Sequence, residues 1–258
     1  MIFVAAGVST PRSMTPLFFG TAEHRLFGVF QPSRRPAGRS GVVLCYPCGQ
    51  EYVPAHKAFK SLASLLADAG HDVLRFDYHG TGDSGGDLDG STRPSWHEDV
   101  SMAIEELKDT SGAEQISLCG LRMGAAWAAQ VAAGRADVDR IVAWDPVVDG
   151  RAYLQSLEPF ATSDGEALEG QGFVLTPETR AQFAAVTPAV YARLRVPTLI
   201  ILTQEDAAGI DPALKAGPGT ERRLEVESVP GPCVWIEGEL GTGGLPVEAL
   251  RRIADWLG

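Results

Sequence analysis

The sequence predicts an α/β protein built on a largely parallel sheet. From residue 20 onward, short apolar runs alternate with segments of helical periodicity, which is the pattern of successive βαβ units. No linker or internal repeat interrupts this alternation. Hydrophobic residues make up 45% of the 258, enough to bury a sizeable core. We therefore expect a single domain over residues 1–258, with 1–16 as a flexible N-terminus.

The first half of the chain predicts a hairpin followed by two strand–helix pairs. Residues 17–32 are typical of an antiparallel hairpin with its turn near Thr21–His24. Residues 55–69 place apolar side chains at helical spacing, and Gly70 is the expected stop. The other predicted elements are strands at 41–47 and 71–78, a tight loop with glycines at 80, 82, 85 and 86, and a helix at 96–108.

The second half continues the alternation of predicted strands and helices, with one interruption. The elements predicted here are a strand at 115–120, an Ala-rich helix at 124–134, strands at 140–146 and 197–204, apolar runs at 224–229 and 232–238, and a last helix at 246–257. Residues 150–194 are less regular and contain no strong strand pattern. We interpret them as a small cap inserted over one end of the sheet; a long surface excursion without function is the alternative.

Charge and hydropathy restrict the partners. The formal net charge is −11 and no basic run occurs, which argues against nucleic acid and against an anionic membrane surface, because both attract clustered Lys and Arg. No stretch approaches about 18 consecutive apolar residues, so no membrane span is expected. The first residues lack the charged start of a secretory signal. We expect a cytoplasmic protein with a small-molecule substrate.

The cysteines are predicted to be buried thiols. Cys45 and Cys48 form a C-x-x-C pair, but Cys45 falls inside an apolar run and no second pair or H-x-x-x-H follows. A zinc site or a redox pair is therefore disfavoured against packed thiols in a reducing compartment. We expect neither a metal nor a cofactor.

The motif "CGLRMGA" at 119–125 is the most informative in the chain. A strand that ends at Gly120, a tight turn, and a small-residue helix from Gly124 form the context in which a G-x-S-x-G motif displays a nucleophilic serine. The central residue here is Arg122.

Several further motifs resemble the α/β-hydrolase superfamily from about residue 17 onward. They are "VVLCYPCGQEY", "GHDVLRFDYHGTGDSGG", "AWDPVVDG", "VPTLIILTQED" and "RRIADWL". The glycine-rich stretch resembles the serine aminopeptidase-like branch, and "YPCGQEY" with "GLRMGA" resembles exosortase-system-associated hydrolases. The resemblance implies an α/β-hydrolase fold with a mostly parallel eight-stranded sheet, helices on both faces and a pocket at the strand ends.

Two positions of the expected catalytic triad lack the required chemistry. Such hydrolases use a serine, an acid and a histidine, in that chain order. Asp206 follows the strand at 197–204, where the family places its acid. All five histidines precede Arg122, however, and the loop at 235–246 offers only Glu237 and Glu239 as ionisable groups. A guanidinium stays protonated at every working pH, so Arg122 cannot replace the serine as nucleophile.

We interpret Arg122 instead as an anion-binding residue. A positive charge above a helix N-terminus requires an anion beside it. That anion is either internal, closing the former active site as a plug, or the carboxylate, phosphate or enolate of a ligand. The internal candidates are Asp206, Glu237, Glu51 and Asp145. The sequence leaves both alternatives open.

The loop at 47–57 is where this fold builds its oxyanion hole, and it supplies further candidates. Cys48 is a candidate nucleophile only if a histidine or cation adjoins it. Glu51 and His79 are candidate acid–base groups, with solvated surface residues as the alternative. The candidate substrate-binding residues are Gly49, Gln50, Met123, Asp145 and Glu237.

Three functions follow, in order of preference. The first is an enzyme that lacks the Ser-His-Asp triad and acts by a non-serine mechanism on an acyl or carboxylate-bearing molecule, in a biosynthetic pathway; it predicts an open pocket with Arg122 unpaired or ligand-bound. The second is a catalytically inactive protein that binds a metabolite or partner, and it predicts Arg122 locked to an acidic side chain. A conventional esterase or thioesterase comes third.

Overall fold

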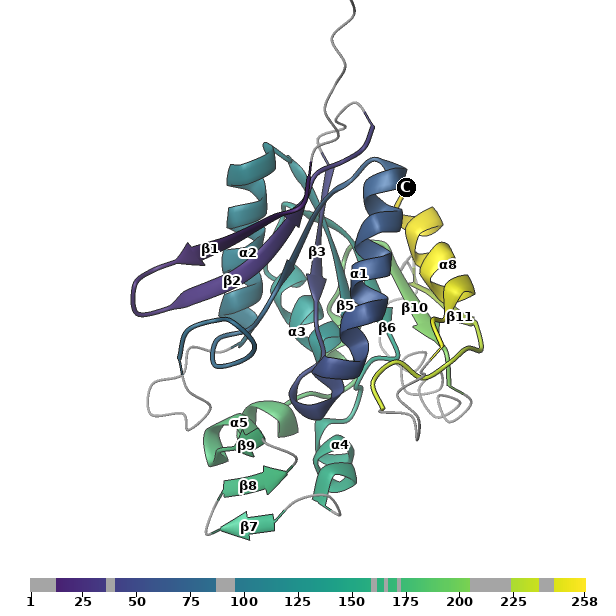
Figure 1. The fold of residues 1–258 in the computed structure, drawn as a ribbon. Helices are drawn as coiled ribbons and strands as arrows, with labels where there is room; N and C mark the ends of the chain where they lie inside the picture. The colour runs from purple at the N-terminus through teal and green to yellow at the C-terminus, as the bar shows by residue number, and fades with distance from the viewer. Residues whose placement is uncertain are drawn as a thin grey trace, which may run out of the picture.

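An eight-stranded sheet forms the centre of the computed structural model (Figure 1). The structure describes residues 13–35, 40–86, 96–158, 162–164, 167–170, 173–204, 224–236 and 244–258. The strands of this sheet are β1 (Thr15–Gly20), β2 (Arg25–Gln31), β3 (Ser40–Cys45), β4 (Asp72–Phe76), β5 (Gln115–Leu121), β6 (Val138–Trp144), β10 (Thr198–Leu202) and β11 (Leu224–Ser228).

The sheet is mostly parallel, as predicted. Its strand order is β1-β2-β4-β3-β5-β6-β10-β11. Only the pairs β1–β2 and β2–β4 are antiparallel. The N-terminal hairpin therefore forms at the predicted place, and its register sets Phe18 opposite Phe27. All carboxyl ends of the parallel strands lie at one end of the sheet, and the turns between strands and helices lie there too. We call this end the sheet edge.

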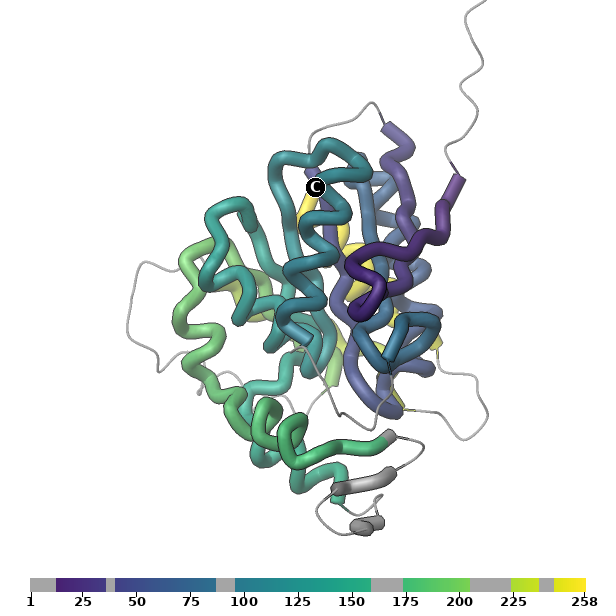
Figure 2. The backbone as a smooth tube through the Cα atoms, turned by 90° about the vertical axis from the view of Figure 1, so that its left-hand side faces the viewer, coloured from purple at the N-terminus to yellow at the C-terminus, as the bar shows by residue number. Residues whose placement is uncertain are grey.

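Helices cover both faces of the sheet, as predicted. On one face, α1 (Tyr52–Ala69) packs beside α8 (Val247–Leu257); α2 (Trp96–Ser111) and α3 (Met123–Ala132) cover the other (Figure 1, Figure 2). Helix α1 begins three residues before the predicted start, because a 3₁₀ turn over Gly49–Glu51 leads directly into it. It ends at Gly70, whose φ of 114° closes the helix as the sequence indicated.

The apolar run at 232–238 forms no strand over its described part, 232–236. Pro230 and Pro232 lack the backbone N–H groups that a sheet ladder needs, which explains why only the run at 224–229 pairs with the sheet. The segment instead lies against the carboxyl end of β10, where the Gln204 side chain donates to the Gly231 carbonyl at 3.0 Å.

The irregular segment at 150–194 forms two short helices, a small sheet and a last helical turn. They are α4 (Gly150–Leu157), β7 (Thr162–Asp164), β8 (Ala167–Gly170), β9 (Phe173–Leu175), α5 (Pro177–Ala184) and α6 (Ala189–Ala192). The three strands pair antiparallel and are three or four residues long, too short to give a strand pattern in the sequence. Except for α6, which packs beside α3, the segment lies beyond the carboxyl ends of the parallel strands (Figure 1).

A chain of aromatic rings joins this segment to the body. The Trp96 and Trp127 rings from α2 and α3 lie 4.6 Å apart, and Phe183 from α5 packs 5.9 Å from Trp127. Tyr153 from α4 follows at 6.0 Å from Phe183. Because large rings bury much apolar area and fix each other's orientation, this cluster sets where α4 stands over the sheet edge.

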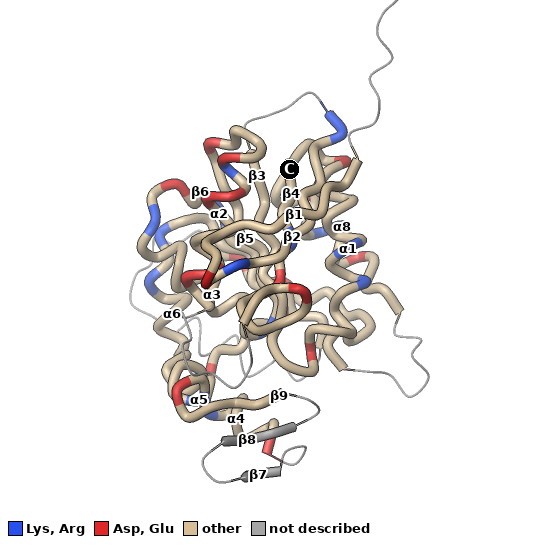
Figure 3. The backbone as a smooth tube through the Cα atoms, turned by 60° about the vertical axis from the view of Figure 1, so that its left-hand side comes forward, with Lys and Arg blue, Asp and Glu red and all other residues tan. Residues whose placement is uncertain are grey.

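Acidic and basic residues are interspersed along the described chain (Figure 3). Within the described ranges, every helix is too short or too polar to cross a bilayer.

Two glycines allow α3 to start directly beneath the end of β3. A Cβ at Gly124 would collide with the backbone carbonyls of Cys45 and Tyr46, and one at Gly120 would collide with the backbone of Ala125. The close contact between α3, β5 and β3 therefore requires glycine at both positions.

We expect Gly124→Ala to lower the free energy of unfolding by about 2–4 kcal/mol, because backbone atoms cannot yield as a flexible side chain would. Gly134→Ala is the matched control, since its Cβ would meet only the Val131 carbonyl at 3.7 Å, and a change within about 0.5 kcal/mol is expected. Urea unfolding measures both; equal stability of the two variants would contradict the packing described here.

Candidate functional site

Arg122 occupies the tip of the turn between β5 and α3. Its φ of 55° and ψ of −120° lie in a region that side chains rarely adopt. The backbone is held from both sides: its N–H donates to the Trp144 carbonyl at 3.0 Å, and its carbonyl accepts from the N–H groups of Ala125 and Val147, both at 3.2 Å. These bonds fix the strained turn and direct the side chain over the sheet edge.

The guanidinium of Arg122 pairs with Glu51. Nε donates to Oε1 of Glu51 at 3.2 Å, and Nη1 donates to the backbone carbonyl of Asp145 at 3.4 Å. Glu51 is the last residue of the 3₁₀ turn after β3, so parallel neighbouring strands deliver the two charges to one place. The exposed fraction is 22% for the Arg122 side chain and 6% for that of Glu51.

Two aromatic rings flank the same guanidinium. Its central carbon lies 5.5 Å from the Tyr153 ring centroid and 5.1 Å from that of Trp235. Both rings present a negative face to the cation, which holds the guanidinium plane in place. Neither Tyr153 nor Trp235 is among the site residues that the sequence predicts. The sequence signal that could have found them is weak: an aromatic residue, Tyr153, lies in the irregular segment at 150–194 and another, Trp235, in the apolar run at 232–238.

Burial governs the ionisation of the pair. Desolvation raises the pKa of Glu51 above its ordinary value, although the charge and hydrogen bond of Arg122 oppose that rise. Burial is the largest single effect on Arg122 and acts against its charge, but the attractions of Glu51, Tyr153 and Asp145 together outweigh it, and the net pKa of Arg122 is raised. Oε2 of Glu51 is buried and accepts no hydrogen bond from the described residues.

One edge of the guanidinium has no strong partner among the described residues. Nη2 of Arg122 donates to no acceptor within the described ranges, and Nη1 makes only the long contact to Asp145. A guanidinium presents its Nη1 and Nη2 groups as a fork that matches a carboxylate or phosphate. The arrangement can therefore hold an external anion while Glu51 stays at Nε.

The Asp145 carboxylate, a predicted candidate for the anion beside Arg122, is bonded to Thr203 instead. It accepts from the backbone N–H of Thr203 at 2.7 Å and from the Thr203 hydroxyl at 2.5 Å. The side chain, on a residue with φ of 40°, therefore ties β6 to the end of β10, and only the carbonyl contacts Arg122. Asp145 fixes the edge of the site, and its carboxylate is not the anion beside the guanidinium.

Cys48, in the loop after β3, is poorly suited to act as a nucleophile. Cys48 is 4% exposed, and its Sγ lies 3.9 Å from the Tyr153 hydroxyl. Burial, with the nearby Glu51 charge, raises the pKa of the thiol, which opposes a thiolate nucleophile. Gly49 takes a φ of 64° to open the turn, Gln50 is half-buried within it, and Met123 is fully buried as the first residue of α3.

His79 belongs to a different cluster. Its ring packs 4.7 Å from the His24 ring, its backbone N–H donates to Oδ2 of Asp99 at 2.8 Å, and its carbonyl accepts from Trp96. Oδ1 of Asp99 lies 2.5 Å from Nε2 of His24. The loop after β4 thus turns His79 toward the hairpin and α2, away from the elbow. Asp206 and Glu237, the other predicted site residues, lie outside the described residues.

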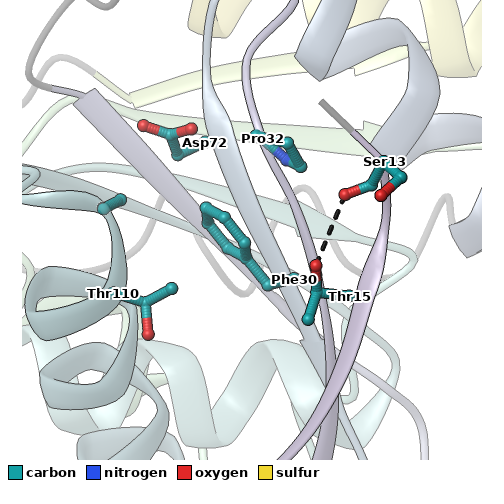
Figure 4. Close-up of a pocket in the computed structure, with 7 residues that line it drawn as sticks. Ser13, Thr15, Phe30, Pro32, Asp72 and Thr110 are labelled. Atoms are coloured by element: carbon teal, nitrogen blue, oxygen red, sulfur yellow. Dashed lines mark hydrogen bonds between the residues drawn. The ribbon is translucent and has the colours of Figure 1, made fainter. Parts of the chain in front are cut away.

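A cavity of about 530 Å³ lies at the opposite edge of the sheet, at the amino ends of the strands (Figure 4). Its lining residues are Ser13, Thr15, Phe30, Pro32, Asp72, Thr110 and Ser111. It contains neither a basic side chain nor a nucleophile beside a base, so it offers less chemistry than the elbow. Within the described ranges, no three histidine, cysteine or acidic side chains group closely enough to hold a metal ion.

The chain is similar to known α/β hydrolases in sequence and structure. Residues 52–169 match the family model of the serine aminopeptidase S33. The human and Pongo abelii palmitoyl-protein thioesterases ABHD10 are 33% identical over 72 residues, which is 28% of this chain. The chain spans about a quarter (23%) of the length of these curated relatives.

Solved structures match nearly the whole chain. The esterase domain of a Rhodothermus marinus protein superposes with a TM-score of 0.69 at 15% identity, covering 96% of this chain and all of that one. Est1E from Butyrivibrio proteoclasticus, with ferulic acid bound, gives a TM-score of 0.69 at 14% identity over 93% of this chain and 98% of its own. These likenesses show the α/β-hydrolase fold that the sequence motifs implied.

We expect Arg122→Gln to destabilise the protein by about 2–3 kcal/mol at pH 8, because it leaves the Glu51 charge buried without a counter-charge. The partial exposure of Arg122 keeps the loss below that of a fully buried pair. Without Arg122 the folded-state pKa of Glu51 rises further, so the missing stability is recovered as the pH falls. The double variant Glu51→Gln/Arg122→Gln should lose less than the single one. Urea unfolding at pH 8 and 5.5 measures this; a pH-independent loss would contradict it.

The His24–Asp99 contact gives a second pH dependence. Burial raises the pKa of Asp99 to about 6, while its bonds from His79 and His24 oppose the rise. The unfolded chain has an ordinary Asp pKa of about 3.9, so this group's contribution is present at low pH and is lost as the pH rises through about 6. Relative to Asp99→Asn, we expect the wild-type unfolding free energy to fall by about 2–3 kcal/mol between pH 4 and 7. Parallel profiles for the two proteins would refute this assignment.

Proposed function

Since the chain has the α/β-hydrolase fold with Arg122 at its elbow, we propose that it binds an anionic, acyl or carboxylate-bearing small molecule there and does not act as a serine hydrolase. The observation that carries the proposal is the ion pair of Arg122 with Glu51, which the catalytically inactive, metabolite-binding alternative predicts. The enzyme alternative predicts an Arg122 that is unpaired or ligand-bound, so it becomes the second candidate. The turn that would raise a nucleophile holds a permanent cation instead, and a buried carboxylate is fixed beside it. Serine catalysis would need a hydroxyl at the tip of this turn and a general base within its reach.

The ligand class follows from the free edge of the guanidinium. Nη1 and Nη2 suit a planar anion with two oxygens, and the Tyr153 and Trp235 rings supply an apolar surround. A carboxylate attached to an apolar chain satisfies both. The sequence match to palmitoyl-protein thioesterases supports an acyl group in the ligand. The resemblance to exosortase-system-associated hydrolases supports a place in a biosynthetic pathway.

A second candidate function is an enzyme with a non-serine mechanism, and Glu51 favours it. The carboxyl is buried, its pKa is raised, and Oε2 lacks a partner in the described part of the chain. A carboxyl in that state can exchange a proton with a ligand held on Arg122. Cys48 and His79 support this function less, because one is a buried thiol and the other packs on the hairpin.

We expect hexanoate to bind the wild-type protein and to bind Arg122→Lys at least tenfold more weakly, because lysine lacks the fork. Arg122→Gln should show no binding, and Arg135→Gln is the matched control that binds normally, because Arg135 follows the opposite end of α3 and pairs with Asp137. Titration calorimetry measures the affinities. Equal affinity for Arg122→Gln and wild type would overturn the proposal.

A fluorophosphonate serine probe should label neither wild type nor Arg122→Ser, since no histidine follows residue 97 to activate a restored hydroxyl. Strong labelling of the wild-type protein would establish a conventional serine esterase instead. Turnover of an acyl thioester that Glu51→Gln abolishes, with hexanoate binding retained, would select the enzymatic candidate over pure binding.

A further inference from the structure

Glu51 depends on one charge for its ionisation. Its Oε1 accepts from Nε of Arg122, its Oε2 has no hydrogen-bond partner in the described ranges, and the residue is 5% exposed. Water therefore does little to stabilise the carboxylate. The charge and hydrogen bond of Arg122 do most of it, and a hydrogen bond with the neutral Tyr153 hydroxyl adds less.

The other titratable groups that face Glu51 carry no charge near neutral pH. The Cys48 thiol and the Tyr153 hydroxyl both have their pKa raised by burial, so both stay neutral. Tyr153 comes from α4 and Cys48 from the loop after β3, so Arg122 is the sole cation among the described groups around this carboxyl. The Asp145 carboxylate is held by Thr203 and acts on Arg122 rather than on Glu51.

An anion on the free edge of Arg122 would place a second negative charge on the same guanidinium. The two anions repel each other across a largely dehydrated site, where charges interact more strongly than in water. Either the external anion is excluded, or one negative charge is removed. Glu51 can lose its charge because Oε2, which has no hydrogen-bond partner in the described part of the chain, can accept a proton.

We infer that anion binding at this site is proton-coupled: when a carboxylate occupies the Nη1–Nη2 edge of Arg122, Glu51 takes up one proton and becomes the neutral acid. This inference rests on the proposed function. The proton comes from bulk water and forms an O–H bond at Oε2, while Oε1 continues to accept from Nε of Arg122. No covalent bond to the ligand forms. The ligand class that fits is therefore a monoanionic carboxylate, since a dianion would leave an excess negative charge.

The coupling fixes how affinity depends on pH. Because the complex holds one more proton than the free protein, affinity should rise about tenfold for each unit by which the pH falls, wherever free Glu51 is ionised. Hexanoate itself stays ionised from pH 6.5 to 8, so it contributes no proton change.

Titration calorimetry of hexanoate, run at pH 7 in buffers of different ionisation enthalpy, counts the protons bound. We expect about one proton for wild type and none for Glu51→Gln, whose amide oxygen still accepts from Nε. Glu51→Gln should bind with an affinity that does not change between pH 6.5 and 8. Infrared difference spectra should show a protonated carboxyl band on binding to wild type and none for the variant.

The outcomes separate this inference from the proposed function. Binding by both proteins without proton uptake would overturn the coupling and leave the function standing. Equal uptake by both would also overturn it, because another group would then be the acceptor. If neither the wild-type protein nor Arg135→Gln binds hexanoate, both the coupling and the proposed function are overturned.

Discussion

The constraint on which the site depends is a permanent positive charge in a poorly hydrated place. The backbone turn at 122 directs the side chain over the sheet edge, and a guanidinium cannot shed its proton there. The surrounding structure therefore has to supply negative potential. It does so with the Glu51 carboxylate, the Asp145 carbonyl and the faces of two rings, each from a different segment of the chain.

These partners also link α4 and the segment after β11 to the same cation. Tyr153 reaches the guanidinium from α4, and the aromatic chain through Phe183 to Trp127 fixes α4 against the body. Trp235 reaches it from the segment after β11. The cation thus joins parts of the chain that the sheet alone does not bring together. The ionised form of Glu51 is destabilised in return, because burial raises the pKa of Glu51 more than Arg122 lowers it.

The sequence allowed the fold to be predicted closely, because glycines, apolar periodicity and the turn motif are local signals. The hairpin and the largely parallel order follow from them, whereas the helices on both faces were implied by the resemblance to α/β hydrolases. The site was harder to predict. Glu51 was one of four candidate carboxylates near strand ends. Of the two that the structure describes, Glu51 and Asp145, the strand register and the 3₁₀ turn bring only the Glu51 carboxylate to the guanidinium. His79 also follows a strand, but Asp99 on α2 accepts its N–H and holds it on the hairpin side. Tyr153 depends on how α4 docks, which no periodicity encodes.

The three hydrogen bonds that hold the elbow involve only the backbone atoms of Arg122. The geometry of the turn is therefore independent of which side chain it displays. A different side chain at the tip thus leaves the backbone scaffold unchanged. The charge of Arg122, by contrast, is stabilised by the Glu51 carboxylate and the Tyr153 and Trp235 rings, so a change of chemistry at the tip has to be matched by changes in three other segments of the chain.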